Sequence, residues 1–237
     1  MCENKGNKRV VAIILAAGLG SRVGAEVTKQ RIKICGHTVL WHTLRAFQSC
    51  EAVDGIVVVV RADERAEVLL DIGDSFSKIH AVINGGKCRA ESAALGFNAI
   101  PEGTDIIAIH DGARCLITPR SIERVVLSAL EKGAATAVSA VTDTVKTVDS
   151  EGKITATLDR SVLRCAQTPQ VFSKDIYGRA LKLCADMERV TDDNMLVESI
   201  GEQVYAVDIE DENLKITTAR DLGYAEFVIS KRSGNDV

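Results

Sequence analysis

Short apolar runs alternate with segments of helical periodicity along most of the chain. The runs are apolar at consecutive positions, which is typical of strands covered by helices on both faces of a parallel sheet. The segments between them gather apolar residues on one face, as Leu40, Leu44 and Phe47 do. We therefore predict strands over Val10–Leu15, Gly55–Val60, Ile79–Ile83, Asp105–Ile109 and Ala134–Ala140, and helices over Val39–Gln48, Asp63–Ile72, Ala90–Ile100 and the stripe from Ile122 to Leu130.

This alternation predicts the α/β class, with an open, doubly wound and mostly parallel sheet that binds ligands at the carboxyl ends of its strands. The alternation stops over residues 141–163, where Val145–Leu158 reads as two strands joined by a turn at Asp149–Gly152. This hairpin either projects as an arm, whose apolar side a second copy of the chain would cover, or lies on the edge of its own sheet. Because no repeat or linker divides the chain, we predict one domain over residues 1–237 with this insertion.

Composition argues against several classes of function. The chain has 237 residues, a net charge of −4 and only 4% aromatic residues, so it lacks the basic excess and stacking rings of nucleic-acid-binding proteins. No apolar run is as long as a membrane span. Lys5, Lys8 and Arg9 before an apolar run resemble a secretory signal, but the first strand explains the same run. The seven cysteines form no C-x-x-C pair, which predicts reduced thiols and a cytoplasmic protein.

The first predicted strand leads into a glycine loop, Ala16-Ala17-Gly18-Leu19-Gly20-Ser21-Arg22, and Lys29 follows it closely. Small residues let backbone N–H groups approach an anion, and Arg22 and Lys29 add two cations. This combination predicts a site for the phosphates of a nucleotide. The dinucleotide fingerprint would need glycine where Val23 stands, and the Walker sequence is absent.

Two further loops follow predicted strands, and each has a functional and a purely structural explanation. The glycine pair Gly85-Gly86 would let the backbone lie against a flat base near Ser92, or would form a plain turn before a helix. Asp111 would hold Mg²⁺ across from the phosphate loop, or would pair with Arg114. His110, beside it, is better explained as a packed and hydrogen-bonded residue than as a catalytic one.

Several later segments combine a hydroxyl group or a cation with small residues. None is diagnostic alone, and Thr191, for example, could simply cap a helix. Together they provide side chains that could bind a second anionic ligand, namely those of Thr144, Arg160, Thr168, Thr191 and Lys215.

The order of these motifs carries a family resemblance. The glycine loop with Lys29-Gln30 comes first, Gly85-Gly86 with Arg89 and Ser92 follows, and the third motif is His110-Asp111-Gly112-Ala113-Arg114. The series continues with Asp143-Thr144, Asp159-Arg160, Thr168-Pro169-Gln170, Thr191-Asp192-Asp193 and Asn213-x-Lys215-Ile216-Thr217. Over nearly its entire length the chain thus resembles the 2-C-methyl-D-erythritol 4-phosphate cytidylyltransferases.

The resemblance implies a Rossmann-like nucleotidyltransferase that transfers CMP from CTP to 2-C-methyl-D-erythritol 4-phosphate, with Mg²⁺, and releases pyrophosphate for isoprenoid-precursor synthesis. It also implies a homodimer joined by the arm, in which Thr144 and Arg160 serve the site of the other subunit. The catalytic residues that it implies are Arg22, Lys29, Arg160 and Lys215. Those implied around the nucleotide are Ala16, Ala17, Gly18, Gly20, Gly86, Ser92 and Gly112, and those around the sugar phosphate are Asp111, Arg114, Thr144, Thr168 and Thr191, with Asp111 also near the metal.

Three positions depart from the family's usual pattern. Thr28 and Cys115 stand where proline is usual, and Asn194 stands where a small residue is common. None of these changes removes a charged group from the implied site. Cys115 would place a thiol near it.

Three other functions were weighed against this one. A ribitol 5-phosphate cytidylyltransferase would favour other residues than Ala16-Ala17-Gly18 and Thr191-Asp192-Asp193. A non-catalytic nucleotide-binding homologue would bind CTP without releasing pyrophosphate. An NAD-dependent oxidoreductase is disfavoured by Val23 in the fingerprint and by Arg61, which stands where an acidic residue should close the second strand.

Overall fold

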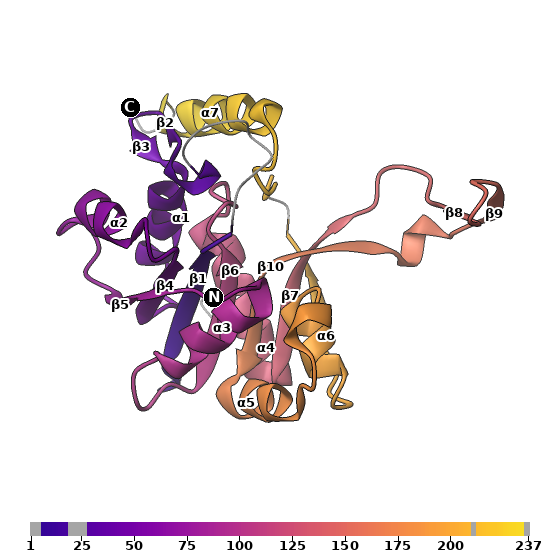
Figure 1. Ribbon diagram of the computed structural model, residues 1–237, viewed down its shortest axis with the longest axis horizontal. Coiled ribbons are helices and arrows are strands. Elements are labelled where there is room, and N and C mark those ends of the chain that lie inside the picture. The colour runs from indigo at the N-terminus through magenta and orange to yellow at the C-terminus, as the bar shows by residue number, and fades with distance from the viewer. Residues whose placement is uncertain (1–5, 19–27, 210–211, 235–237) are drawn as a thin grey trace.

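The computed structural model describes residues 6–18, 28–209 and 212–234, and its centre is a twisted sheet (Figure 1). Within these residues the sheet has seven strands in the order β11-β7-β10-β6-β1-β4-β5. All neighbours are parallel except at β10, which runs antiparallel to both β6 and β7. The doubly wound, mostly parallel sheet is therefore confirmed. The strands are β1 (Val10–Ala16), β4 (Gly55–Val60), β5 (Ile79–Asn84), β6 (Ile106–Asp111), β7 (Ala134–Ala140), β10 (Arg164–Ser173) and β11 (Tyr205–Asp208).

Helices cover both faces of the sheet, which explains why its central strands are apolar at consecutive positions. Every residue of β1 and β4 is buried. Alternate side chains of β1 pack against α1 (Val39–Gln48), α2 (Arg65–Ile72) and α4 (Pro119–Lys132) on one face. The intervening side chains pack against α3 (Arg89–Asn98), α5 (Lys174–Leu183) and α6 (Asp193–Glu198) on the other face.

The predicted elements up to residue 140 are confirmed, with small shifts at their ends. The observed bounds of α1, β4 and β7 are the predicted ones, whereas α2 begins two residues later than predicted, at Arg65. Helix α4 begins earlier than its apolar stripe, because Thr118 accepts the N–H of Ser121 as an N-cap and Pro119 occupies the first turn. It ends at Lys132, and Gly133 follows as its C-cap, with a φ of 88° that suits glycine. Strand β6 continues to Asp111, so this carboxylate belongs to the strand itself.

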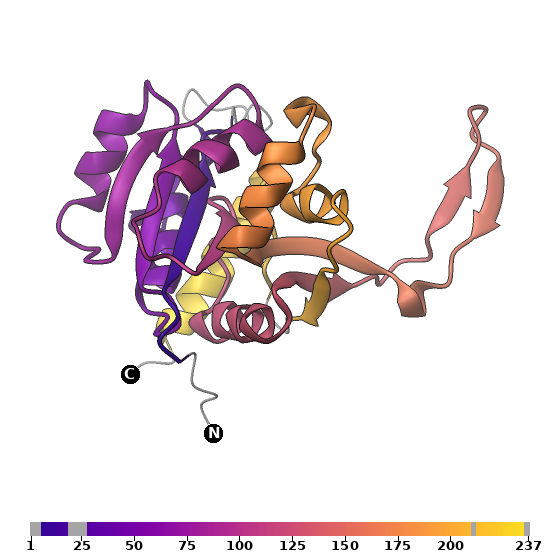
Figure 2. The ribbon, with the colours of Figure 1, turned by 90° about the horizontal axis from the view of Figure 1, so that it is seen from below.

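The hairpin projects from the body as an arm, which both views show (Figures 1 and 2). Strands β8 (Lys146–Val148) and β9 (Ile154–Thr157) pair only with each other in the sheets described, and all their residues are exposed. At the turn, the side chain of Asp149 accepts the N–H groups of Glu151 and Lys153 at 3.0 and 2.9 Å. Of the two arrangements considered for the hairpin, the edge of its own sheet is thus wrong. A short helix, η2 (Arg160–Val162), leads back to the body.

A third apolar cluster attaches the C-terminal helix α7 (Ala219–Gly234) to the rest of the molecule. Ala225 and Val228 of α7 pack near Leu116 and near the small β2–β3 sheet (Lys33–Ile34 and His37–Thr38). The segment before α7 is held by the N–H of Ile216, which donates to the carbonyl of Ala113 at 2.9 Å. This attachment places residues 213–216 beside the end of β6. The remaining short helices are η1 (Lys29–Arg31) and η3 (Met187–Arg189).

Candidate active site

A cleft of about 510 Å³ opens at the carboxyl ends of the central strands. The sheet has its topological switch at β1, which pairs with β4 on one side and with β6 on the other. Ligands of open α/β sheets bind at such a point because loops diverge there to the two faces. The cleft is lined by Leu15, Ala17, Gly18, Lys29, Gln30, Arg61, Ala62, Asp63, Gly85, Gly86, Lys87, Cys88, Arg89, Ser92, Asp111, Ala113 and Lys215.

Asp111 is the electrostatic centre of this cleft. Its carboxylate, only 7% exposed as a residue, lies 2.9 Å from Nζ of Lys215, 3.3 Å from Nε of Arg114 and 3.4 Å from Nε of Arg89. Burial alone would raise the pKa of Asp111, but the three cations outweigh burial and hold the pKa well below its usual range. The carboxylate is therefore ionised and faces three cations, one of which, Arg89, also pairs with a second carboxylate, Asp193.

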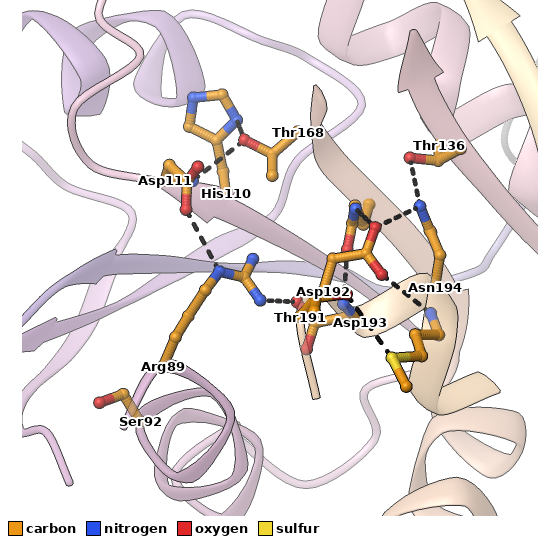
Figure 3. Close-up of polar contacts among 12 residues, drawn as sticks. Arg89, Ser92, His110, Asp111, Thr136, Thr168, Thr191, Asp192, Asp193 and Asn194 are labelled. Atoms are coloured by element: carbon orange, nitrogen blue, oxygen red, sulfur yellow. Dashed lines mark hydrogen bonds and ion pairs between the residues drawn. The ribbon is translucent and has the colours of Figure 1, made fainter. Parts of the chain in front are cut away.

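His110 is a structural residue, as expected. Its ring is fully buried against Phe47, with the ring centroids 4.9 Å apart. Nδ1 shares a hydrogen bond with Oγ1 of Thr168 at 3.0 Å, and Nε2 lies 3.2 Å from the carbonyl of Arg114. Burial lowers the pKa of His110 to about 3, so the ring is neutral. The same Thr168 hydroxyl accepts the backbone N–H of Asp111 at 3.1 Å, which fixes the end of β6 (Figure 3).

The glycine pair on the other side of the cleft is packed too closely for larger residues. A Cβ on Gly85 would lie 2.3 Å from the Cβ of Ala17 and 2.9 Å from Oγ of Ser92. The Ser92 hydroxyl accepts the N–H of Gly86 at 3.1 Å and donates to the carbonyl of Cys88 at 3.0 Å. The loop between β5 and α3 is thus held flat against the loop that follows β1. This close approach gives the glycines a structural reason, and both of them also line the cleft.

Arg89, a cleft residue outside the predicted set, joins the two sides of the cleft. Its NH1 donates to Oδ2 of the buried Asp193 at 2.6 Å, while its Nε faces Asp111 (Figure 3). Asp193 in turn accepts the hydroxyl of Tyr177 at 2.7 Å. Arg89 and Asp193 both stand in motifs that carry the resemblance, but nothing in the sequence pairs residues 104 positions apart.

The structure brings part of the predicted set together. Arg114 and Thr168 contact Asp111 but do not line the cleft, and the predicted residues that do line it are Ala17, Gly18, Lys29, Gly86, Ser92, Asp111 and Lys215. Ala16 is buried at the end of β1, and a Cβ on Gly112 would lie 3.1 Å from the Cβ of Ala16. Arg22 and Gly20 lie outside the described residues.

Three predicted residues of the second ligand do not line this chain's cleft. Thr144 and Arg160 belong to the arm, where NH1 of Arg160 donates to the carbonyl of Thr142 at 2.6 Å. Thr191 is exposed before α6 and donates to the sulfur of Met195 at 3.5 Å. Thr191 does not cap α6, because the cap is Asp192, whose carboxylate accepts the N–H of Met195 at 2.9 Å.

Two departures from the family pattern have a clear structural outcome. Cys115 is buried among Leu116, Ile216 and their neighbours rather than in the cleft, and burial raises the pKa of its thiol to about 12. Cys115 therefore does not line the cleft, and among the described residues the cysteine that does is Cys88. Asn194 is buried, and its Nδ2 donates to Thr136 Oγ1 and to Asp192, both at 3.1 Å. Thr28 precedes η1 in an extended conformation.

Comparisons with known proteins agree with this geometry. The family profile described as 2-C-methyl-D-erythritol 4-phosphate cytidylyltransferase matches residues 10–231. Relatives of that name from Geobacter metallireducens and Desulforamulus reducens are 42% and 39% identical, over 94% of this chain and 98% and 97% of their own lengths. A crystal structure of 4-diphosphocytidyl-2C-methyl-D-erythritol synthase from Anaerococcus prevotii superposes with a TM-score of 0.83 at 29% identity, covering 94% of this chain and 96% of that one. Within the described residues, none of the helices has the length and apolar character needed to span a bilayer.

Proposed function

The chain belongs to the 2-C-methyl-D-erythritol 4-phosphate cytidylyltransferase family and transfers CMP from CTP to 2-C-methyl-D-erythritol 4-phosphate in the non-mevalonate route to isoprenoid precursors, and we propose that this transfer takes place in the cleft around Asp111. The observation that supports the location is the convergence of Arg89, Arg114 and Lys215 on one buried carboxylate at the switch point of the sheet. The excess of positive charge suits two substrates that both bring phosphates.

The reaction needs positioning and charge more than it needs a base. A phosphate oxygen of the sugar attacks the α-phosphorus of CTP, the bond to the β-phosphate breaks, and pyrophosphate leaves with the electron pair. The attacking oxygen is already anionic near neutral pH, so no general base is required. In-line placement and cations at the developing charge then lower the barrier. Lys29 and Arg22 are proposed to contact the triphosphate, and Lys215 is proposed to hold the attacking phosphate.

The cytidine is proposed to lie along the loop between β5 and α3. Ala17, Gly18, Gly86 and Ser92 border this part of the cleft, and glycine has no side chain to keep a flat base away from the backbone. Ser92 is buried and holds the loop, so its part in base recognition is to fix the backbone edge. Ala16 and Gly112 pack behind this surface and set its depth.

A divalent cation, Mg²⁺ in the first instance, fits the oxygen chemistry of this site. Among the described residues, no three His, Cys, Asp or Glu side chains gather as a metal site. Mg²⁺ is nevertheless commonly bound by one or two carboxylates together with substrate phosphates. Asp111 would supply the carboxylate, and the metal, when bound, would neutralise phosphate charge. The two longest ion pairs of Asp111, to Arg114 and Arg89 at 3.3 and 3.4 Å, are the ones that a metal ion would replace most easily.

The sugar phosphate is proposed to bind beyond Asp111, between Lys215 and Thr191. Arg114 and Thr168 direct their polar atoms to Asp111 and to the surrounding backbone, so we assign them a positioning role. Thr144 and Arg160 complete the site only from the arm of a second copy, because their own arm stands away from the body (Figure 1). This arrangement supports a homodimer. Free Cys35 and Cys165, both exposed, support the proposed cytoplasmic location.

The experiment that tests the function is an assay of pyrophosphate release from CTP. Release with 2-C-methyl-D-erythritol 4-phosphate, and not with ribitol 5-phosphate, is the expected result. The opposite preference would make the chain a ribitol phosphate enzyme. Binding of CTP by calorimetry with no pyrophosphate from either polyol phosphate would make it a non-catalytic homologue.

A further inference from the structure

Arg89 is shared between two carboxylates at unequal distances. Its NH1 lies 2.6 Å from Oδ2 of Asp193, whereas its Nε lies 3.4 Å from Oδ1 of Asp111. A guanidinium prefers to meet a carboxylate with two parallel N–H groups, which gives both specificity and strength. Here Asp111 receives only one long contact from Arg89, and the shorter bond goes to Asp193. The guanidinium of Arg89 is therefore held back from Oδ1 of Asp111, whereas Lys215 and Arg114 contact Oδ2.

Asp193 is itself fixed from several directions. Its carboxylate is buried, and Oδ1 accepts the hydroxyl of Tyr177 at 2.7 Å. The ring of Tyr177 is fully buried between Phe97 and Phe172, at centroid distances of 5.4 and 5.5 Å. The backbone N–H of Asp193 donates to the side chain of Gln170 at 2.8 Å. A carboxylate held in this way has little freedom to follow Arg89 into the cleft.

We propose that Asp193, anchored by Tyr177, is a positioning residue that restrains Arg89 and so keeps Oδ1 of Asp111 available to the divalent cation. This inference rests on the proposed function, since it assigns Asp111 to that cation. Without the carboxylate at position 193, the Arg89 fork turns toward Asp111, forms two hydrogen bonds with it and competes with the metal. Partners that orient a metal ligand typically alter metal affinity by about 10- to 100-fold when they are removed.

The test measures Mn²⁺ binding by electron paramagnetic resonance on the full-length protein, with a non-hydrolysable CTP analogue present. Asp193→Asn is expected to weaken Mn²⁺ binding by about 10- to 100-fold. The same substitution in an Arg89→Gln background is expected to change the constant by less than about 2-fold, because the competing fork is gone. Asp186→Asn, an exposed carboxylate paired with Arg189, is the matched control for loss of one acidic group.

Tyr177→Phe tests the anchor without changing any charge, and it stays informative if Asp193→Asn does not fold. Loss of this one hydrogen bond is expected to weaken Mn²⁺ binding by about 2- to 10-fold. Wild-type Mn²⁺ affinity in both Asp193→Asn and Tyr177→Phe would overturn the inference, and so would an undiminished effect of Asp193→Asn in the Arg89→Gln background. Either result leaves the proposed function standing, whereas a wild-type protein that releases no pyrophosphate refutes the function first.

Discussion

The cleft and the arm organise their charged residues in opposite ways. In the cleft, Asp111 is buried and holds three cations from three different segments of the chain. In the arm, Arg160 is exposed, and among the contacts described its side chain bonds only to the nearby carbonyl of Thr142. Low exposure strengthens the electrostatic interactions in the cleft, whereas water screens those of the arm. The cleft residues thus contact one another within a single chain, whereas the arm residues make few contacts with the body.

The apolar residues repeat this contrast. The side chains on both faces of β1 are covered by helices. On the arm, Val148, Ile154 and Val162 are exposed, the last at 77%. An exposed apolar group on a projecting hairpin is a feature of surfaces that meet another molecule. The difference shows that the body packs its apolar residues within one chain, whereas the arm leaves several apolar residues in water, as the proposed contact with a second copy requires.

The largest expected effect tests the cleft. Lys29→Ala, and separately Arg22→Ala, should lower kcat about 10²- to 10³-fold, since each removes a cation at the developing charge. Circular dichroism and thermal unfolding should stay as in the wild type. Lys182→Ala, an exposed residue on α5, serves as the control for loss of a lysine. Near-normal turnover in both Lys29→Ala and Arg22→Ala would contradict the roles proposed for these two residues.

A second substitution tests whether the arm acts on another copy. Arg160→Ala should lower kcat/KM about 10- to 100-fold, the value of one hydrogen bond to a charged group. If the arm serves the other subunit, mixing Arg160→Ala chains with Lys29→Ala chains restores activity, because one site of each mixed dimer then holds neither substitution. Mixtures that remain as inactive as their parents would show that Arg160 serves its own chain.

The free energy of unfolding should depend on pH through His110, which is buried next to Asp111. Burial lowers its pKa in the folded protein to about 3, against an ordinary value of 6.5. Below pH 6.5 the unfolded chain takes up a proton on His110 that the folded protein does not. The contribution of His110 to the free energy of unfolding is therefore largest above this pH. It falls as the pH drops toward 3, by about 1.4 kcal/mol per pH unit. In His110→Asn the slope, measured by denaturant titration between about pH 5.5 and 4, should be smaller by that amount.

An identical slope in the wild type and in His110→Asn would contradict this linkage. The total stability of the variant is not the readout, since the substitution also removes the contacts of the ring with Thr168 and Phe47.

The smallest expected effect concerns the stability of the body when the arm is changed. Val162→Ser should alter the free energy of unfolding of the monomer by less than about 0.5 kcal/mol, because the side chain touches little. The same change should weaken association of two copies by about 10-fold, since an apolar side chain no longer leaves water. Denaturant titration measures the free energy of unfolding, and sedimentation over a range of protein concentrations measures the monomer–dimer equilibrium. Unchanged association would place the interface elsewhere.

Much of the body could be predicted from the sequence because its information is local. Consecutive apolar positions predicted β1 and β4, and a helical stripe predicted α4, since period and burial act over a few residues. Asp111 at the end of an apolar strand, and the tight Gly85-Gly86 pair, were also visible in the sequence. No elements were predicted from the pattern beyond residue 163, so the antiparallel β10 and the helices that follow it came from the structure alone.

The pairings within the site were decided by tertiary structure. Asp193 joins Arg89 across 104 positions, and Asp192 rather than Thr191 caps α6. Cys115 follows a motif of the cleft yet lies in an apolar cluster, because the chain turns away directly after Arg114. Residue types and local periodicity determined which groups the chain carries and which segments form strands. Which of those groups come into contact depends on how distant segments pack, and local sequence patterns do not specify contacts between residues far apart in the chain.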